Sequence, residues 1–172
     1  MDPLKYPIGK FTPPTTITAA HIQVWLSDFR QLPLDFKVAS QQIAANGQLD
    51  TPYRPGGWTA RQVIHHVADS HVNSYMRFKL ALTEDHPTIR PYEEAEWAKL
   101  PDYQLEPKVS LILLTQIHAR LGHLLAALSP AQWERTFVHP AQQKTATLGY
   151  NIGMYAWHGR HHLGHLQLIL AH

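Results

Sequence analysis

The sequence predicts an all-α protein, a bundle of four main helices that includes one long crossover connection. Three observations support this fold class. Apolar residues recur at helical spacing in four segments of about twenty residues or more, no convincing run of strand-forming residues separates them, and no internal repeat is visible. The 172 residues fit a single domain spanning 1–172, which is long enough to bury roughly two-thirds of its unfolded surface.

The first helix is expected to follow an extended arm. Residues 1–14 carry four prolines, which do not continue a helix. A threonine cap within 15–18 predicts a helix that ends near residue 45. Pro33 lies inside this helix. We expect a kink or a division there, because proline lacks the amide N–H that a regular helix uses.

The second helix is bounded by breakers on its N-terminal side. The stretch 46–57 contains Asn-Gly and Pro-Gly-Gly, which interrupt regular structure. Thr59 is the predicted N-cap of a helix over Ala60–Thr83, whose apolar residues keep helical spacing. The next segment, 84–108, is polar and holds four prolines. It predicts a long excursion with one short helix near 92–97.

The remaining helices lie in the C-terminal third of the chain. A leucine-rich segment predicts a third main helix over 109–128, and Ser-Pro at its end opens a short helical turn over 129–133. The segment 137–147 is expected to be irregular or hairpin-like. A last helix is predicted over 148–171.

Composition and charge narrow the class of partner. Fifteen Lys and Arg are set against thirteen Asp and Glu without forming a block, so the formal charge of +2 does not predict nucleic-acid binding. No segment approaches the ~20 consecutive apolar residues of a membrane span, and the N-terminus has no apolar signal core. There is no cysteine. We therefore expect a cytoplasmic protein with a small-molecule partner.

The unusual feature is histidine. Seven of the thirteen histidines fall in two short clusters, one in each of two predicted helices. In the second cluster, His158 and His162 are about 40° apart on the helix and share an apolar arc. In the first cluster, His66 shares one edge of its helix with Val63 and Ser70. His65 lies in line with Arg61 and Asp69 on a polar side.

This arrangement predicts a metal site made of His66, His158 and His162. Two histidines at i and i+4 can present both rings to one ion, and a third from a facing helix completes a triangle. Three neutral imidazoles leave open positions on the ion for water or substrate, as in reactive sites. We expect one divalent transition metal per subunit, and metal affinity that falls as the pH drops through about 6.5.

Several alternatives remain open from the residues alone. His161 and His165 have the same spacing as the favoured pair, and the cluster as a whole could merely cover a helix surface. His71 also faces inward, and a core or supporting role is favoured over ligation. Asn151 and Tyr155 lie on the same arc as His158 and could line the mouth of a pocket.

Four stretches of the chain resemble the DinB superfamily, and within it the YfiT-type metal-dependent hydrolases. They are Tyr6-Pro-Ile-Gly, the run from Leu49 to His71, Arg77-Phe-Lys-Leu-Ala-Leu-Thr-Glu, and the run from Tyr155 to His165. The resemblance implies a bundle of up-down-down-up topology that binds zinc, nickel or a similar ion through three histidines. The family pattern places those ligands on His66, His158 and His162. It also implies a homodimer.

The resemblance leaves the reaction open. The first reaction that the resemblance implies is hydrolysis by a metal-activated water. The alternative is a metal-dependent transfer of a low-molecular-weight thiol, such as bacillithiol, mycothiol or glutathione, because related bundles carry out that reaction. A second alternative is a metal-binding module without catalysis. The inner faces of the two histidine helices carry no Glu or Asp beside the predicted ligands, so no general base is apparent.

Overall fold

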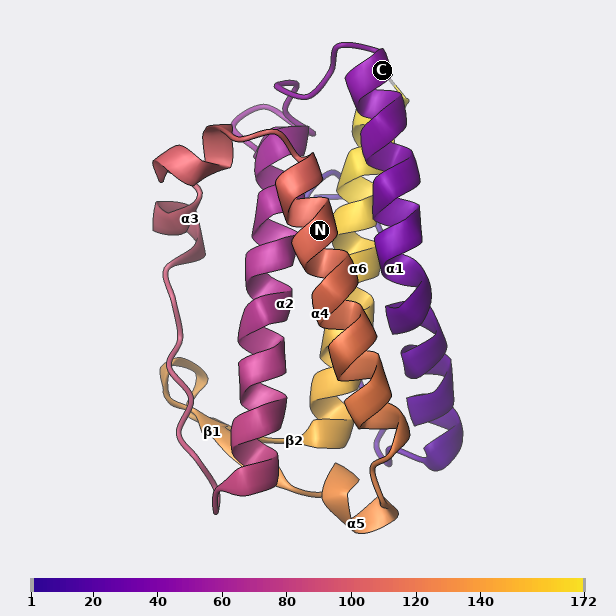
Figure 1. Ribbon diagram of the computed structural model, residues 1–172, viewed down its shortest axis with the longest axis vertical. Coiled ribbons are helices and arrows are strands. Elements are labelled where there is room, and N and C mark those ends of the chain that lie inside the picture. Colours follow the sequence, from indigo (N-terminus) through magenta and orange to yellow (C-terminus); the bar gives the residue numbers. More distant parts are fainter. Residues whose placement is uncertain (1, 172) are drawn as a thin grey trace.

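The computed structural model describes residues 2–171, apart from the side chains of Gln142 and Lys144, and its long helices form a bundle (Figure 1). The long helices are α1 (Ala19–Ala45), α2 (Ala60–Thr83), α4 (Lys108–Ala126) and α6 (Leu148–Leu170). α1 and α6 run upward in Figure 1, whereas α2 and α4 run downward. The predicted all-α class and the up-down-down-up topology are therefore confirmed.

The shorter elements belong to the connections. They are α3 (Glu94–Trp97), the 3-10 helix η1 (Pro101–Gln104), α5 (Pro130–Trp133), β1 (Thr136–His139), the 3-10 helix η2 (Pro140–Gln142) and β2 (Lys144–Thr147). The crossover from α2 to α4 contains α3 and η1 and returns along the full length of α2 (Figure 1). The predicted short helices near 92–97 and 129–133 are both present. The segment predicted to be irregular or hairpin-like is an antiparallel hairpin, with Thr136 opposite Thr147.

Threonine caps fix where three of the four long helices begin. Thr18 accepts a hydrogen bond from the amide of His21 and starts α1. Thr59 and Gln62 form a capping box, in which each side chain bonds the other residue's backbone, so α2 begins at Ala60 as predicted. Thr147 caps α6 through the amide of Tyr150. These caps set the register of the histidines on both helices.

Pro33 does not divide α1, which is one continuous helix from Ala19 to Ala45. Of the kink or division predicted at Pro33, the division is therefore wrong. In a regular helix the amide of residue 33 would donate to the carbonyl of Phe29. Here His118 of α4 donates to that oxygen instead, over 2.7 Å. The helix continues because a side chain from a neighbouring helix satisfies the freed carbonyl.

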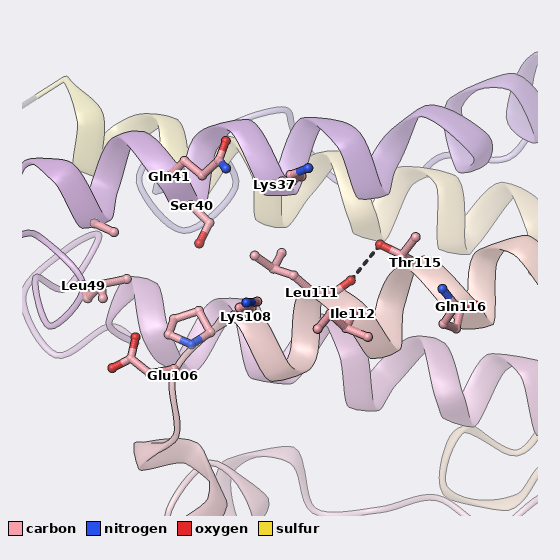
Figure 2. A pocket seen from close by; sticks show the side chains of 12 residues that line it. Lys37, Ser40, Gln41, Leu49, Glu106, Lys108, Leu111, Ile112, Thr115 and Gln116 are labelled. Carbon is pink, nitrogen blue, oxygen red and sulfur yellow. Dashed lines mark hydrogen bonds between the residues drawn. The ribbon is translucent and has the colours of Figure 1, made fainter.

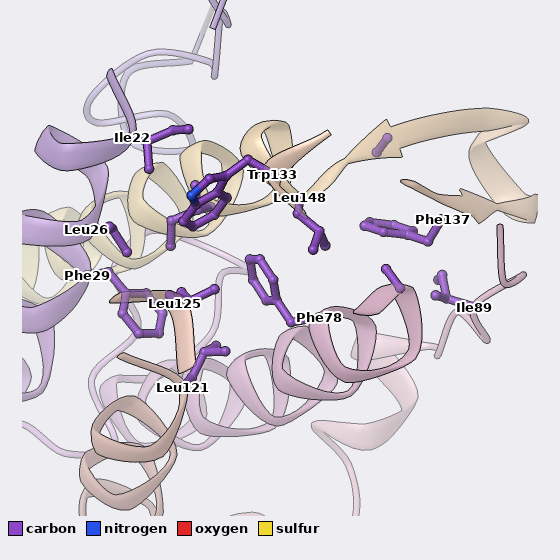
Figure 3. Close-up of a cluster of buried hydrophobic side chains, with 13 residues drawn as sticks. Ile22, Leu26, Phe29, Phe78, Ile89, Leu121, Leu125, Trp133, Phe137 and Leu148 are labelled. Atoms are coloured by element: carbon purple, nitrogen blue, oxygen red, sulfur yellow. The ribbon is translucent and has the colours of Figure 1, made fainter. Parts of the chain in front are cut away.

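The core consists of two apolar clusters at opposite ends of the bundle. One cluster, which includes Phe78, Trp133 and Leu148, fills the end nearest the hairpin (Figure 3). The other, around Phe36, Val63 and Leu166, fills the opposite end. Along their helices, His71 of α2, His118 of α4 and the buried histidines of α6 lie between the two clusters, and His65 and His66 lie within the second cluster's part of α2. The middle of the bundle is thus polar, and burying polar groups there requires partners for them.

One helix of the described residues, α4, is long and apolar enough to cross a membrane by length and composition alone. A core helix of a bundle passes the same test. α4 packs against both α1 and α2, and its outward side exposes Val109, Ile112 and Leu113.

Candidate functional site

The three histidines predicted as ligands meet in the middle of the bundle. α2 provides His66, and α6 provides His158 and His162. The Nε2 atoms of His66 and His158 are 3.3 Å apart, and ring nitrogens of all three residues lie within 4.8 Å of one another. Two nitrogens each about 2.0–2.1 Å from one zinc ion at the tetrahedral angle are about 3.3–3.4 Å apart. The spacing therefore suits an ion between the rings.

Close helix packing and an aromatic ring enclose this cluster. The ring of Trp58, next to the Thr59 cap, lies 4.6 Å from the ring of His66 and 6.3 Å from that of His162. On the other side, a Cβ added to Gly159 would come within 2.3 Å of Leu32 on α1. The absent side chain lets α6 approach α1 directly beside His158.

Burial keeps the three imidazoles neutral. Desolvation, together with repulsion from His161 and His165, lowers the pKa of His66 to about 4. Burial also lowers the pKa of His158 and of His162 well below the usual value for histidine. A neutral imidazole carries the lone pair that a metal ion requires. The donor set thus fits a divalent transition metal, although no contact in the structure identifies which one.

A second histidine cluster overlaps the first. Ring nitrogens of His161, His162 and His165 also lie within 4.8 Å of one another. Both clusters therefore contain His162. A neutral imidazole has a single lone pair, so His162 cannot serve both clusters as a neutral ligand.

His65 does not lie on an open polar surface, contrary to the sequence-based expectation. It is buried, with its Nδ1 atom 2.7 Å from Ser110 Oγ and its Nε2 atom 3.1 Å from the carbonyl of Leu105. The crossover covers this side of α2, where Tyr103 donates a hydrogen bond to Asp69 over 2.7 Å. The helical pattern could not reveal this cover, because it comes from a segment forty residues away.

His71 is fully buried and belongs to a chain of hydrogen bonds. Its Nδ1 atom lies 2.8 Å from His118 Nε2, and His118 Nδ1 donates to the carbonyl of Phe29. His118 Nε2 is therefore an acceptor, and His71 donates to it. The remaining nitrogen of His71, Nε2, has no hydrogen-bond partner. The His71 ring lies 5.8 Å from that of His158, so the chain ends beside the candidate metal site.

A cavity of about 150 Å³ adjoins His158 and is lined by Asn151 and Tyr155, the two residues predicted at a pocket mouth. The structure adds Arg77 of α2, whose Nη1 atom donates to the hydroxyl of Tyr155 over 3.1 Å. It also adds Glu94 of α3. Asn151 is buried, and its amide nitrogen has no hydrogen-bond partner.

Sequence reasoning missed Arg77 and Glu94 for different reasons. Arg77 lies eleven residues after His66, three helical turns along the same face of α2, so helical spacing could have indicated it. Glu94 comes from the crossover. Two backbone hydrogen bonds, from the amide of Ile89 to the carbonyl of Val138 and from the amide of Val138 to the carbonyl of Pro87, tie that crossover to the hairpin and bring its next residues to the cavity. No local pattern in the sequence contains that information.

A larger hollow of about 430 Å³ lies elsewhere, between α1 and α4 (Figure 2). Ser40, Leu111 and Ile112 are among the residues that line it, and none of its lining residues is a histidine. Both apolar and polar side chains line this groove. The histidine cluster and its adjoining cavity are the better candidate for a reactive site.

The fold and the site define a helical-bundle protein with a buried three-histidine cluster beside a small cavity. Residues 42–166 match the family model of the DinB superfamily, and the chain belongs to this superfamily. It is 52% identical over 166 residues to a Bacillus mycoides protein, covering 96% of this chain and 95% of the relative. A Bacillus cereus protein is 51% identical with the same coverage. Both relatives are named "Putative metal-dependent hydrolase".

Solved structures agree with this assignment. YfiT from Bacillus subtilis, described as "a probable metal-dependent hydrolase with an unusual four-helix bundle topology", superposes with a TM-score of 0.94. It is 44% identical, and the match covers 98% of this chain and 97% of YfiT. The mycothiol-dependent maleylpyruvate isomerase gives a TM-score of 0.65 at 21% identity, over 87% of this chain and 66% of the isomerase. At that identity the likeness is one of fold.

Proposed function

We propose that this protein is a metal-dependent hydrolase in which His66, His158 and His162 hold one divalent ion, zinc in preference to nickel. The observation that carries the proposal is the meeting of three neutral imidazoles beside a cavity. Three protein ligands leave room for water or substrate on the ion. An ion bound there would supply a water with its pKa lowered toward ~7.

The cavity beside His158 suits a small substrate with an acidic group. The guanidinium of Arg77 lines it, and no carboxylate of the described residues lies within 4 Å of that group. Asn151, whose buried amide nitrogen is a donor without a partner, is another residue that lines this cavity. Two donors, one of them charged, favour an anionic substrate group such as a carboxylate.

Glu94 adds a carboxylate that the helices themselves do not provide. Burial raises its pKa above the usual value, the neighbouring Glu93 raises it further, and Arg77 opposes this shift. A carboxyl group beside a cavity can accept a proton from a reacting group and return it. We assign it the role of proton acceptor in the hydrolase reaction.

The second candidate is transfer of a low-molecular-weight thiol to an electrophile. It is favoured by one observation: no carboxylate of the described residues hydrogen-bonds to His66, His158 or His162. A thiol made acidic by the ion can react without a general base beside the ligands. A third candidate, a metal-binding module without catalysis, requires only the histidines.

Metal-dependent kinetics separate these candidates. The purified protein is stripped with a chelator, reloaded with zinc or nickel, and assayed against activated esters and alkyl halides with and without added thiol. The hydrolase proposal expects ester cleavage that needs metal and no thiol, and that is lost in His158→Ala. Products carrying the thiol would favour the transferase. Metal binding without turnover of any substrate, together with melting of the stripped protein, would favour the module.

We also propose that the protein is a cytoplasmic homodimer with a small-molecule partner. The outward side of α4 exposes Val109, Ile112 and Leu113, and neighbouring α1 exposes Leu34 and Val38. Apolar side chains gathered on one face are typical of protein interfaces. Sedimentation of the purified protein tests the dimer directly.

A further inference from the structure

A hydrogen-bonded pair of histidines joins the candidate metal site to the N-terminal arm. His162 Nδ1 lies 3.2 Å from His165 Nδ1. On the far side of the same ring, His165 Nε2 lies 3.3 Å from the backbone carbonyl oxygen of Lys5. His165 is almost fully buried and its ring stacks on Tyr53, with centroids 3.8 Å apart, so the ring is held in one orientation.

These contacts determine where each proton lies. A carbonyl oxygen only accepts hydrogen bonds, so the hydrogen must sit on Nε2 of His165. His165 is buried and no carboxylate of the described residues pairs with it, so its ring is a neutral imidazole whose Nδ1 atom carries a lone pair. That lone pair can accept only if His162 carries its hydrogen on Nδ1. A neutral His162 then has its own lone pair on Nε2.

We propose that His165 is a positioning residue, which holds His162 in the tautomer that presents the Nε2 lone pair to a metal ion shared with His66 and His158. This inference rests on the proposed metal site. Partners of this kind orient metal-binding histidines and raise their basicity. The assignment also separates the two overlapping clusters, because His162 and His165 then share a proton and do not share an ion.

The N-terminal arm is docked so that it can supply the carbonyl. Trp157 Nε1 donates to the carbonyl of Gly9 over 3.2 Å. Pro7 packs closely on α6, where a Cβ added to Gly164 would lie 2.9 Å from the proline ring. The arm therefore lies against the same helix that carries the ligands, and Lys5 is held above His165.

Nuclear magnetic resonance of the metal-free protein tests the tautomers directly. Long-range ¹H–¹⁵N spectra distinguish a protonated imidazole nitrogen from a bare one. At pH 7.5 we expect the hydrogen of His162 on Nδ1 and that of His165 on Nε2. A hydrogen on Nε2 of His162 would overturn the proposal. This measurement needs no metal, so it stands even if the proposed metal site fails.

Metal affinity of three variants provides the second test. His165→Phe keeps the stacked ring and removes both nitrogens, and we expect zinc affinity to fall about 10–100-fold. His165→Asn places an amide oxygen near the position of Nδ1 and should restore most of that loss. His161→Phe is the matched control, because no hydrogen bond of His161 Nδ1 is present and its ring packs on Trp157. Its affinity should stay within about threefold of wild type.

The zinc affinities of the His165 variants and the number of bound zinc ions can each contradict the proposal. Equal weakening in His165→Phe and His165→Asn, or none in His165→Phe, would contradict the positioning role. Two zinc ions per chain would contradict the separation of the clusters. If His165→Phe does not fold, as judged by circular dichroism, the comparison of His165→Asn with wild type and the tautomer spectra decide the question. If wild type binds no metal while the tautomers are as expected, the metal proposal fails and the hydrogen-bond assignment stands.

Discussion

The Nδ1 atom of His118 lies 2.7 Å from the backbone carbonyl oxygen of Phe29, and this oxygen is free because residue 33 is a proline. The contact ties α4 to α1 and fixes the proton positions in the polar middle layer. His118 donates to Phe29, His71 donates to His118, and the His71 Nε2 lone pair faces the interior beside His158. A helix-breaking residue thus helps to organise the surroundings of the candidate site.

Acid should destabilise the protein partly through His118. Burial lowers its pKa to about 4, whereas the unfolded chain has a value near 6.5. As the pH falls, the unfolded chain binds the proton first, so stability that is present above about pH 6.5 is lost as the pH falls toward 4. At 1.36 kcal/mol per pKa unit, this one residue accounts for about 3 kcal/mol.

The substitution His118→Asn isolates that contribution. The asparagine amide can still donate to Phe29, but it does not titrate. We expect the free energy of unfolding of metal-free His118→Asn to fall less between pH 7 and pH 4.5 than that of wild type, by about 1–2 kcal/mol. Urea denaturation at several pH values measures this. Parallel pH profiles of the two proteins would show that His118 is not the titrating group.

Single substitutions should separate ligands from their neighbours. His158→Ala and His66→Ala each remove one of three proposed ligands, and most bound metal should be lost. His161→Ala should keep metal content close to wild type. His65→Ala should also keep metal, but it removes the bonds to Ser110 and Leu105 and should cost about 1–3 kcal/mol of stability.

Plasma emission measures the metal content of these four variants, and circular dichroism checks that each is folded. Each proposed ligand is compared with a histidine of the same helix that is not a proposed ligand. This comparison controls for general effects of losing a histidine from that helix. Metal loss confined to His65→Ala and His161→Ala would contradict the ligand assignment. Loss in all four folded variants would mean that contacts around the ligands contribute as much as the ligands do.

The pH dependence of metal binding should differ from that expected of exposed histidines. The sequence alone predicted a loss of affinity as the pH falls through about 6.5. The structure places the pKa of His66 at about 4 and those of His158 and His162 well below the usual value. The free ligands are therefore neutral at pH 5.5. Zinc affinity should change little between pH 7.5 and 5.5 and fall steeply below about pH 5.

Calorimetric titration with zinc at pH 7.5, 5.5 and 4.5 checks this expectation. The metal-free protein must be folded at each pH, which circular dichroism establishes. A tenfold or larger loss between pH 7.5 and 5.5 would show that the imidazoles titrate near their unperturbed values. Burial would then lower the pKa values of the three histidines less than the packing around them indicates.

Helical periodicity was enough to predict the helices and the inward-facing sides of the three histidines. Thr59 and the apolar spacing after it fixed α2, and the arc shared by His158 and His162 placed both rings inward. These features depend only on residues within one helix. The cap, the apolar stripe and the four-residue spacing are all local.

The remaining features depend on contacts between distant segments. Burial of His65 comes from the crossover, and the continuity of α1 through Pro33 comes from His118 of another helix. Glu94 reaches the cavity because the crossover is tied to the hairpin. Nothing in the sequence near any of these residues describes its eventual partner, so local patterns could not predict them.

Arg77 should distinguish acidic from neutral substrates. In Arg77→Met the positive charge of the cavity is lost while the stem of the side chain remains. For a matched pair of esters that differ only in a carboxylate, we expect KM of the acidic ester to rise about tenfold and that of the neutral ester to stay nearly unchanged. Arg160→Met is the control, because Arg160 pairs with Asp28 on the outside of α6. Equal effects on both esters would remove the case for an anionic substrate.

Two glycines in the middle of helices should respond to alanine in opposite ways. At Gly159 of α6, an added Cβ would lie 2.3 Å from one methyl carbon of Leu32 and 2.8 Å from the other, and Leu32 is buried. Gly159→Ala must therefore displace the buried side chain of Leu32 between α1 and α6, at a cost of about 1–3 kcal/mol. At Gly122 of α4, no such atom lies within 4 Å. Gly122→Ala should stabilise the protein by about 0.4–1 kcal/mol, because alanine restricts the unfolded chain and suits a helix.

The same pair tests whether helix packing holds the metal site. Gly159 follows His158 directly, so a shift of α6 would displace that ring from His66, whereas Gly122 is on a helix without a proposed ligand. Thermal unfolding and zinc titration of both variants measure the two effects. We expect Gly159→Ala to lose stability and at least about tenfold in zinc affinity, because ligand geometry must hold within a fraction of an ångström. Unchanged zinc affinity in a destabilised Gly159→Ala would show that the three histidines adjust independently of the contact between α1 and α6.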